Sequence, residues 1–339
     1  MHAYQIRPGS DIDSLARVEL ASAPLGPREL RIRVHAVSLN YRDLMVARGD
    51  YLVSSGTPIV PCSDAAGEVV EVGSQVTRFR VGDRVAGSFF PSWQDGEPTP
   101  ATTADAPGAA SDGVLAEVLV RHEDSVVAVP SHLDYLEAST LPCAAVTAWN
   151  ALFEEGRLQP GSTVLLLGTG GVSISALQLA RAAGLRTIIT SSSDAKLERA
   201  RSLGADATIH YRRTPDWEVE VERLTQGRGV DLVVEVGGQG TLPRSIASAR
   251  MGGRVAVIGG VSGFGASDIQ PLHIIGGAKR ISGIFVGSRG MFERLNQFVA
   301  KSALRPVIDR VFSFDQAPQA FAHLRSAQHF GKVVIQVRD

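Results

Sequence analysis

The feature that most constrains the fold is a regular alternation of apolar strands and amphipathic helices between residues 162 and 287. Helical spacing is clear in VSISALQLARAAG (172–184) and DAKLERARSLG (194–204). The expected strands are mostly apolar runs: STVLLLG (162–168), LRTIITS (185–191), ATIHY (207–211), VDLVVEVGG (230–238), RVAVIGG (254–260) and RISGIFVG (280–287). Strands that are apolar throughout are buried on both faces, so the pattern predicts an α/β fold with a doubly wound parallel sheet.

A glycine-rich turn stands at the first strand-to-helix junction of this series. Gly168-Thr169-Gly170-Gly171-Val172-Ser173 follows a strand and opens a helix, which is the context of the Rossmann dinucleotide fingerprint. Gly168 permits the tight turn and Gly170 lets the backbone approach a pyrophosphate. The helix start at Gly171 and Val172 then directs N–H groups at the phosphates. Ser173 replaces the third glycine of the pattern, and we expect its small side chain to allow close packing of helix and strand. A purely structural turn is the alternative, but the place of the motif favours a cofactor cradle.

The end of the second strand indicates which cofactor is bound. An NAD site needs an acid there for the ribose 2′-hydroxyl, whereas this chain has serines from residue 191 to 193 and only then Asp194, as a helix cap. Hydroxyls of Ser191 and Ser192 with the ammonium of Lys196 suit a 2′-phosphate, and Tyr211 is placed to cover the adenosine. We therefore predict NADPH. The alternative is that the serines only cap a helix and that Lys196 is solvated.

The two ends of the chain differ from this central part. Residues 1–130 contain short strands such as 29–39, 66–73 and two within 114–130, which predict a compact β-structure; the segment 89–113 is a long loop. Helical spacing begins at 135–156. Residues 289–339 add two helices and a closing strand, GKVVIQV, expected to pack on the N-terminal part. We therefore expect three segments: 1–130, an NADP-binding domain at 131–288, and 289–339.

Composition excludes several classes of protein. The 339 residues are 44% hydrophobic and 20% charged, with a net charge of −1, which argues against a nucleic-acid partner. Two cysteines are too few for a disulfide scaffold and indicate a cytoplasmic protein. The apolar runs fall short of the roughly 18 to 20 residues that cross a bilayer, so no membrane association is expected.

Together these stretches resemble the medium-chain dehydrogenase/reductase superfamily, and within it the zinc-independent, quinone-oxidoreductase-like branch. The resemblance covers nearly the whole chain and rests on the segments 65–87, 141–152, 168–173, 191–212 and 227–238. It implies a GroES-like catalytic domain built from both chain ends, a Rossmann domain between them and a cofactor cleft between the two domains. It also implies a homodimer formed by pairing RISGIFVG, since an apolar edge strand needs a cover.

The resemblance also bears on metal binding. Zinc-dependent relatives hold a catalytic ion with Cys, His and Cys, and the matching positions here are Asn40, Ser63 and Cys143. The loop 89–113, which matches the structural zinc lobe, has no cysteine. We therefore predict no metal, with Cys143 structural rather than catalytic. Hydride must then reach a carbon that conjugation already activates, in a quinone or an α,β-unsaturated carbonyl. The alternatives are an NADP-dependent alcohol or ketone dehydrogenase and an NADPH-binding protein with little turnover.

The resemblance implies further site residues for a small-molecule substrate and the cofactor. Asn40 and Tyr51 have the spacing of a catalytic pair in related enoyl-thioester reductases; packing is the alternative for Tyr51, and a place in the nicotinamide pocket the alternative for Asn40. A phenol with an ordinary pKa near 10 is protonated at neutral pH and can donate. The implied cofactor contacts are Thr147, Ile258, Gly259, Phe285, Val286 and Lys332. Arg42, Asp43 and Asp64 are expected to be structural.

Overall fold

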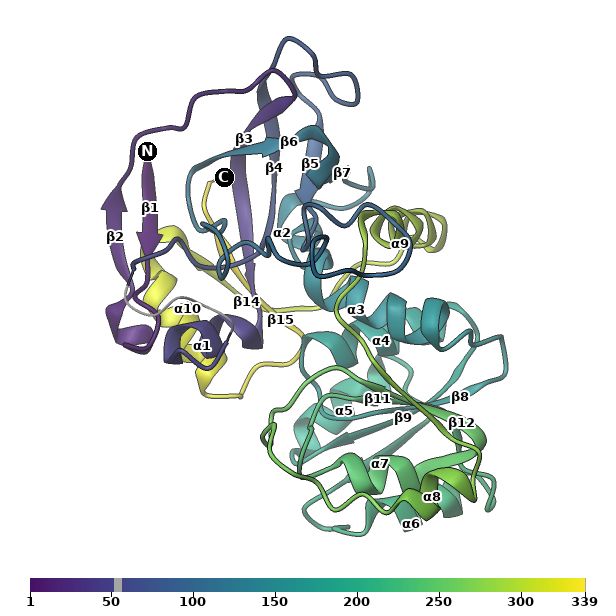
Figure 1. Ribbon diagram of the computed structural model, residues 1–339. Helices are drawn as coiled ribbons and strands as arrows, with labels where there is room; N and C mark the ends of the chain where they lie inside the picture. The colour runs from purple at the N-terminus through teal and green to yellow at the C-terminus, as the bar shows by residue number, and fades with distance from the viewer. Residues whose placement is uncertain (52–56, 339) are drawn as a thin grey trace. The chain divides into compact units, whose positions relative to one another are not determined.

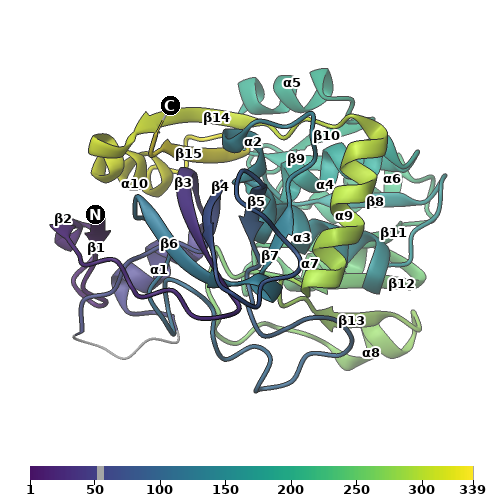
Figure 2. The same ribbon diagram turned by 90° about the horizontal axis from the view of Figure 1, so that it is seen from above.

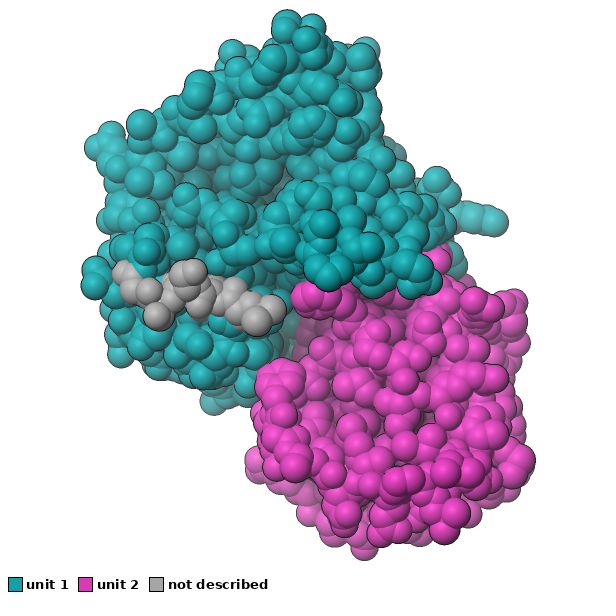
Figure 3. All heavy atoms as spheres, viewed as in Figure 1, with its two compact units in different colours: residues 1–146, 287–339 teal, residues 147–286 magenta. Residues whose placement is uncertain are grey.

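The computed structural model describes residues 1–51 and 57–338. The chain forms two compact units, which Figure 3 distinguishes by colour. Unit 1 combines Met1–Val146 with Gly287–Asp339, and unit 2 is the continuous segment Thr147–Val286. Among the residues that the structure describes, no helix combines the length and apolar character that a membrane crossing requires.

Unit 2 is built around a six-stranded parallel sheet in the order β10-β9-β8-β11-β12-β13. Its strands are β8 (Thr163–Leu166), β9 (Arg186–Ser191), β10 (Ala207–His210), β11 (Val230–Glu235), β12 (Ala249–Val257) and β13 (Arg280–Gly283). Its helices are α4 (Gly171–Ala182), α5 (Asp194–Ser202), α6 (Trp217–Leu224), α7 (Leu242–Ser248) and α8 (Pro271–Ile275). Figure 1 shows α4 and α5 on one side of this sheet and α6, α7 and α8 on the other. The predicted doubly wound parallel sheet is therefore confirmed, and its strand order reverses between β8 and β11, where ligands bind in such folds.

Unit 1 contains a mainly antiparallel sheet in the order β14-β15-β3-β4-β5-β7, with β6 paired to β3. The strands are β3 (Glu29–Leu39), β4 (Asp64–Val72), β5 (Arg84–Gly87), β6 (Val118–His122), β7 (Val126–Ala128), β14 (Ile308–Ser313) and β15 (Lys332–Gln336), with a separate pair β1 (His2–Gln5) and β2 (Ala16–Glu19). The helices are α1 (Tyr41–Arg48), α2 (Tyr135–Ala138), α9 (Arg289–Ser302) and α10 (Ala317–Arg325), and the short α3 (Val146–Trp149) follows at the unit boundary. This matches the expected β-rich, GroES-like domain.

The last strand of the chain pairs with a strand near its beginning. β15 runs antiparallel to β3, with Val333 opposite Leu39 and Ile335 opposite Val37 (Figure 2). On one face of these strands, Val37, Ile335 and Phe321 of α10 belong to one buried apolar cluster. This pairing places the start of β15 beside the end of β3 and the start of α1, where the polar residues of unit 1 gather.

Three stretches differ from the simple sequence pattern. The predicted helix over 135–156 is divided, because π-helical turns at Leu141–Ala145 and Asn150–Glu155 flank α3. The predicted strand over 280–287 ends at Gly283, since Val286 adopts the left-handed backbone region with φ 53°. The elements α8 and β14 were not expected, because each is short and lacks a clear hydrophobic period.

Candidate active site

The glycine turn between β8 and α4 has open space in front of it. Gly168 has φ 70°, a left-handed conformation that favours glycine, and a Cβ at Gly168 or Gly170 would meet no atom of the described residues within 4 Å. Gly170 caps α4 without any side-chain hydrogen bond, so the N–H groups of the first turn, at Gly171 and Val172, face no capping side chain. Ser173 is buried and donates from Oγ to the carbonyl oxygen of Leu167 at 2.6 Å, which joins helix to strand closely.

The predicted 2′-phosphate residues come from two neighbouring strands. Ser191 ends β9 opposite His210 of β10, and the Tyr211 N–H donates to the Ser191 carbonyl oxygen at 3.1 Å. Ser192 follows Ser191, and Lys196 lies in the first turn of α5. The cap of α5 is Ser193, whose Oγ accepts from the Lys196 N–H at 3.4 Å, so the expectation that Asp194 is the cap is wrong.

Two arginines beside this group were missed in the sequence. Arg213 forms an ion pair with Asp194, which offsets the one acid at the start of α5. Arg212 is exposed next to Tyr211. The signal was present as the Arg-Arg pair directly after Tyr211, at the carboxyl end of a parallel strand where ligands bind. With these two arginines, the positive charge near Ser191, Ser192 and Lys196 is greater than the sequence analysis assumed, and it favours binding of an anion.

Glu235 organises the loop at the switch point of the sheet and was also missed. Its carboxylate is fully buried and accepts from the N–H groups of Gly237 and Gly238 at 2.6 and 2.9 Å. It also accepts from Thr241 Oγ1 at 2.6 Å and from Ser245 Oγ. The predicted residue Ile258 donates its N–H to the Glu235 carbonyl oxygen at 2.8 Å. An acid at the end of a buried strand was the available signal, because a buried carboxylate requires several donors.

The remaining unit 2 candidates occupy the ends of strands and one helix. Gly259 follows Ile258 at the end of β12, where a Cβ would contact the Val236 carbonyl oxygen at 3.0 Å. Thr147 is buried in α3. Phe285 is 42% exposed beyond the end of β13, whereas Val286 is buried and its carbonyl oxygen accepts from Asn150 Nδ2 at 2.9 Å.

A cluster of buried polar side chains lies in unit 1 at the end of β3. Lys332 Nζ donates to the carbonyl oxygen of Leu39 at 2.7 Å and to Asn40 Oδ1, so the structure places both predicted residues together. Asp43 caps α1 by accepting from the Asn40 N–H at 2.7 Å. Burial raises the pKa of Asp43 to about 6, although Arg42 and Lys332 oppose the shift. Asn40 Nδ2 and Asp43 Oδ1 are buried and have no hydrogen-bond partner among the described residues.

Asp64 connects this region to the π-helical turn at residue 143. Ser63 Oγ donates to Asp64 Oδ1 at 2.6 Å, and the backbone N–H of Cys143 donates to Asp64 Oδ2 at 3.0 Å. Burial raises the pKa of the Cys143 thiol, and Asp64 reinforces the effect, so the thiol is neutral at physiological pH. Asp64 therefore holds backbone in place.

Arg42 is the unexpected member of the cluster. Its Nη1 donates to the Pro107 carbonyl oxygen at 2.9 Å, and its guanidinium lies over the rings of Tyr51 and Phe89, 5.1 and 4.7 Å from their centroids. Its Nε and Nη2, on the edge that binds carboxylates in bidentate fashion, are buried and have no hydrogen-bond partner within residues 1–51 and 57–338. Burial raises the pKa of Tyr51, with Arg42 opposing, so the phenol keeps its proton at neutral pH.

The donors at the three zinc-matching positions do not fit a zinc ion. Asn40 offers an amide whose oxygen already accepts from Lys332 and Ser63 a hydroxyl bonded to Asp64, so only Cys143 offers a side chain that zinc commonly binds. Zinc sites use thiolates, imidazoles and carboxylates. Over residues 1–51 and 57–338, no group of three or more His, Cys, Asp or Glu side chains is arranged to hold a metal.

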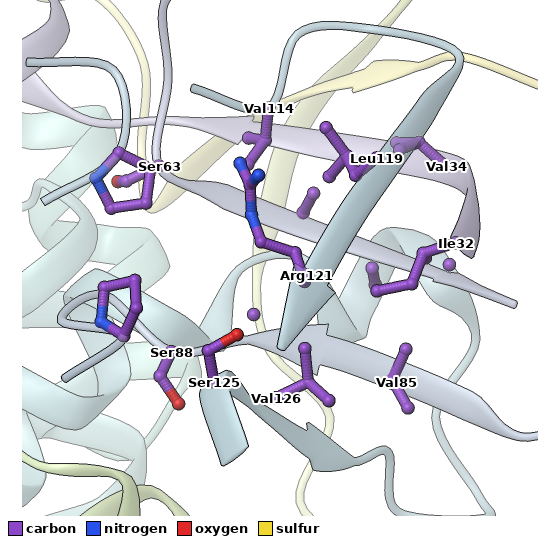
Figure 4. Close-up of a pocket in the computed structure, with 16 residues that line it drawn as sticks. Ile32, Val34, Ser63, Val85, Ser88, Val114, Leu119, Arg121, Ser125 and Val126 are labelled. Carbon is purple, nitrogen blue, oxygen red and sulfur yellow. The ribbon is translucent and has the colours of Figure 1, made fainter. Parts of the chain in front are cut away.

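A cavity within unit 1 adjoins this cluster and shares Ser63 and Pro107 with it. Apolar side chains of the sheet, among them Val34, Val85 and Val126, form most of its wall (Figure 4). Arg121 lies in this wall and donates to the carbonyl oxygens of Val120 and Gly113 at 3.0 and 3.1 Å. Burial lowers its pKa. These bonds to backbone indicate a structural role for Arg121.

Comparison with known proteins identifies the family. Two family models match the chain: Alcohol dehydrogenase GroES-like domain over residues 26–131, and Zinc-binding dehydrogenase over residues 171–301. A zinc-type alcohol dehydrogenase-like protein of Schizosaccharomyces pombe is 43% identical over 318 residues, covering 92% of each chain.

Solved structures agree with this result. An NAD-dependent alcohol dehydrogenase matches with a TM-score of 0.90 and 32% identity over 100% of both chains. A quinone oxidoreductase of Pseudomonas syringae pv. Tomato DC3000 matches with a TM-score of 0.83 and 26% identity over 99% of both. The chain therefore belongs to the medium-chain dehydrogenase/reductase superfamily of oxidoreductases, which includes quinone oxidoreductase-like members.

Proposed function

We propose that the chain is an NADPH-dependent oxidoreductase that reduces a quinone or an α,β-unsaturated carbonyl without zinc. The observation that carries this proposal is the set of unpaired donors in the unit 1 cluster. Asn40 Nδ2 and Arg42 Nε and Nη2 are buried without an acceptor in the part of the chain that the structure describes. Reduction of a conjugated carbonyl places negative charge on its oxygen as the enolate or phenolate forms, and preorganised donors stabilise that charge.

The residues of unit 2 fit a nicotinamide dinucleotide. The space before Gly168 and Gly170 and the uncapped first turn of α4 suit a pyrophosphate. Ser191, Lys196 and the neighbouring Arg212 suit a 2′-phosphate, which supports NADPH over NADH. When bound, this cofactor supplies the hydride.

The residues of unit 1 then have separate tasks. Arg42 donates from its Nε–Nη2 edge to the substrate oxygen and holds the developing charge there. Tyr51 keeps its phenolic proton at neutral pH because burial raises its pKa, and it delivers that proton to the reduced substrate. Lys332 fixes the Asn40 amide by its bond to Oδ1, which leaves Nδ2 as a further donor. The buried aromatic side chains Phe89 and Trp93 exclude water from Arg42 and its surroundings.

An alcohol dehydrogenase is the second candidate, because the Schizosaccharomyces pombe relative carries a zinc-type alcohol dehydrogenase-like name. The two functions differ in metal content and in substrate. Purified protein is analysed for zinc by mass spectrometry and assayed with NADPH against quinones and enones, and with NADP against alcohols. We expect NADPH oxidation on the first panel and less than one zinc per ten chains. One zinc per chain with alcohol oxidation would establish the second candidate instead.

Two variants test the assigned roles within the same assay. Arg42→Met removes the charge and the donors but retains an apolar stem, and we expect kcat to fall about 100-fold, as for loss of an oxyanion donor. Tyr51→Phe removes only the hydroxyl, and we expect kcat to fall about tenfold or more with little change in KM. Arg121→Met is the matched control, since Arg121 bonds only backbone carbonyls. Full activity in Tyr51→Phe would remove the phenol from the mechanism.

We also propose a homodimer formed through unit 2. In the sheet of unit 2, β13 is an edge strand, and Phe264, Leu272 and Ile275, in the chain segment that precedes it, are each at least 70% exposed. An edge strand with exposed apolar side chains nearby is a typical site for pairing with a second copy of the same chain.

A further inference from the structure

Val286 adopts a backbone conformation that its side chain disfavours. Its φ is 53°, in the left-handed region, where a β-branched side chain is a steric outlier. Such conformations persist only where the surroundings impose them, and they concentrate at ligand-binding and catalytic sites. Val286 is also buried, so contact with water does not compensate for the strain.

Asn150 holds this strained residue. Its Nδ2 donates to the Val286 carbonyl oxygen at 2.9 Å, and Asn150 is itself only 8% exposed. The preceding backbone is fixed independently, because the Ile284 N–H donates to the Val257 carbonyl oxygen at 2.8 Å. The backbone at Phe285 is therefore fixed on both sides, by the end of β12 and by Asn150.

Asn150 begins the π-helical turn Asn150–Glu155, and the other end of that turn is tied to the same strands. Glu155 Oε1 accepts from Ser282 Oγ at 2.7 Å, and the Glu155 carbonyl oxygen accepts from Arg254 Nη1 at 2.9 Å. Arg254 and Ser282 belong to β12 and β13. The turn thus ties the segment beyond β13 to residues within β12 and β13, and π-helical turns frequently accompany functional sites.

We infer that Asn150 is a positioning residue for the nicotinamide end of the cofactor. It acts through Val286, by holding the left-handed conformation that sets the backbone of Phe285 and Val286 toward the ligand. This inference rests on the proposed NADPH-binding function and on the cofactor contacts that the resemblance implies for Phe285 and Val286. Asn150 itself need not touch the cofactor.

The test uses the full chain and equilibrium binding measured by fluorescence and calorimetry. Asn150→Asp keeps the size of the side chain and removes the N–H donor, and we expect the Kd for NADPH to rise about tenfold, as for one lost hydrogen bond. Binding of 2′,5′-ADP, which has no nicotinamide, should remain within about twofold. Adding Val286→Gly to Asn150→Asp should restore most of the NADPH affinity, because glycine adopts positive φ without strain.

A matched control and a second variant make the result decisive. Asn296 in α9 also donates from a buried Nδ2 to a carbonyl oxygen, that of Ala128, at 2.9 Å, so Asn296→Asp should lower Tm without changing NADPH affinity. Val286→Pro forces φ to about −65° with Asn150 intact and should weaken NADPH as Asn150→Asp does. Unchanged NADPH binding in either variant that folds, equal weakening of both ligands, or no rescue by glycine would overturn the inference. Failure of the wild-type chain to bind either nucleotide would instead overturn the proposed function.

Discussion

Asp43 provides a quantitative test of the buried cluster through the pH dependence of stability. Its carboxyl is 1% exposed, and burial raises its pKa from 3.8 to about 6 in the folded chain. An acid whose pKa is higher in the folded chain than in the unfolded chain makes its full contribution to stability at pH values below the unfolded pKa. This contribution is lost as the pH rises through the folded pKa of about 6. The difference between the two pKa values corresponds to about 3 kcal/mol, of which about 2 kcal/mol falls between pH 4 and pH 7.5.

Asp43→Asn removes this titration while retaining an oxygen that can accept from the Asn40 N–H. Urea unfolding of both proteins is followed by tryptophan fluorescence at several pH values between about 4 and 7.5. We expect the wild-type free energy of unfolding to fall by about 2 kcal/mol relative to Asp43→Asn across this range. The other acids titrate in both proteins, so they cancel in the difference.

Asp231 provides a control of opposite sign. Its pKa is lowered, despite its burial, because Thr163 N–H, Arg250 and Arg228 donate to its carboxylate. A lowered folded pKa gives stability that is present above the unfolded pKa and lost as the pH falls. The free energy of unfolding of the wild type should therefore increase relative to that of Asp231→Asn as the pH rises from about 3 to 5. For Asp43 the refuting result is different: if the free energies of unfolding of wild type and Asp43→Asn change in parallel with pH, residue 43 does not carry a buried carboxyl with a raised pKa.

Three further outcomes follow from the sites described above. Lys196→Ala should raise the KM for NADPH about tenfold and leave that for NADH unchanged, measured in steady-state assays; equal effects would count against a 2′-phosphate contact. Gly170→Val should leave Tm within a few degrees, since a Cβ there meets no protein atom, yet abolish NADPH binding by calorimetry; retained binding would contradict the pyrophosphate cradle. Phe264→Asp with Ile275→Asp should convert a dimer to a monomer in light scattering, and a wild-type monomer would remove the dimer proposal.

The central α/β fold was predictable because its signals are local. The central strands β8, β9 and β11 are buried on both faces, and glycine at 168 stands where the backbone requires positive φ. Ser173 was correctly predicted to join helix and strand closely, because a small side chain at that position contacts the preceding strand. Periodicity and turn chemistry within a few residues are sufficient for such predictions.

The arrangement of the polar side chains was less predictable, because it depends on contacts between distant segments. Arg42 was expected to form a structural pair or cap, but it bonds the carbonyl oxygen of Pro107, 65 positions further along the chain. Lys332 reaches Asn40 only because β15 pairs with β3. Val286 was placed in a strand, since no sequence pattern reports the bond from Asn150 that holds its left-handed conformation.

The pairing of β15 with β3 has a consequence for synthesis of the chain. Unit 1 draws on residues 1–146 and 287–339, whereas unit 2 is a single uninterrupted segment. During translation the segment 147–286 emerges complete while β3 still lacks the neighbour that supplies Lys332. The Rossmann sheet therefore has the material to form on the ribosome first, and the N-terminal sheet must wait, with one edge open, until residues 332–336 have been synthesised.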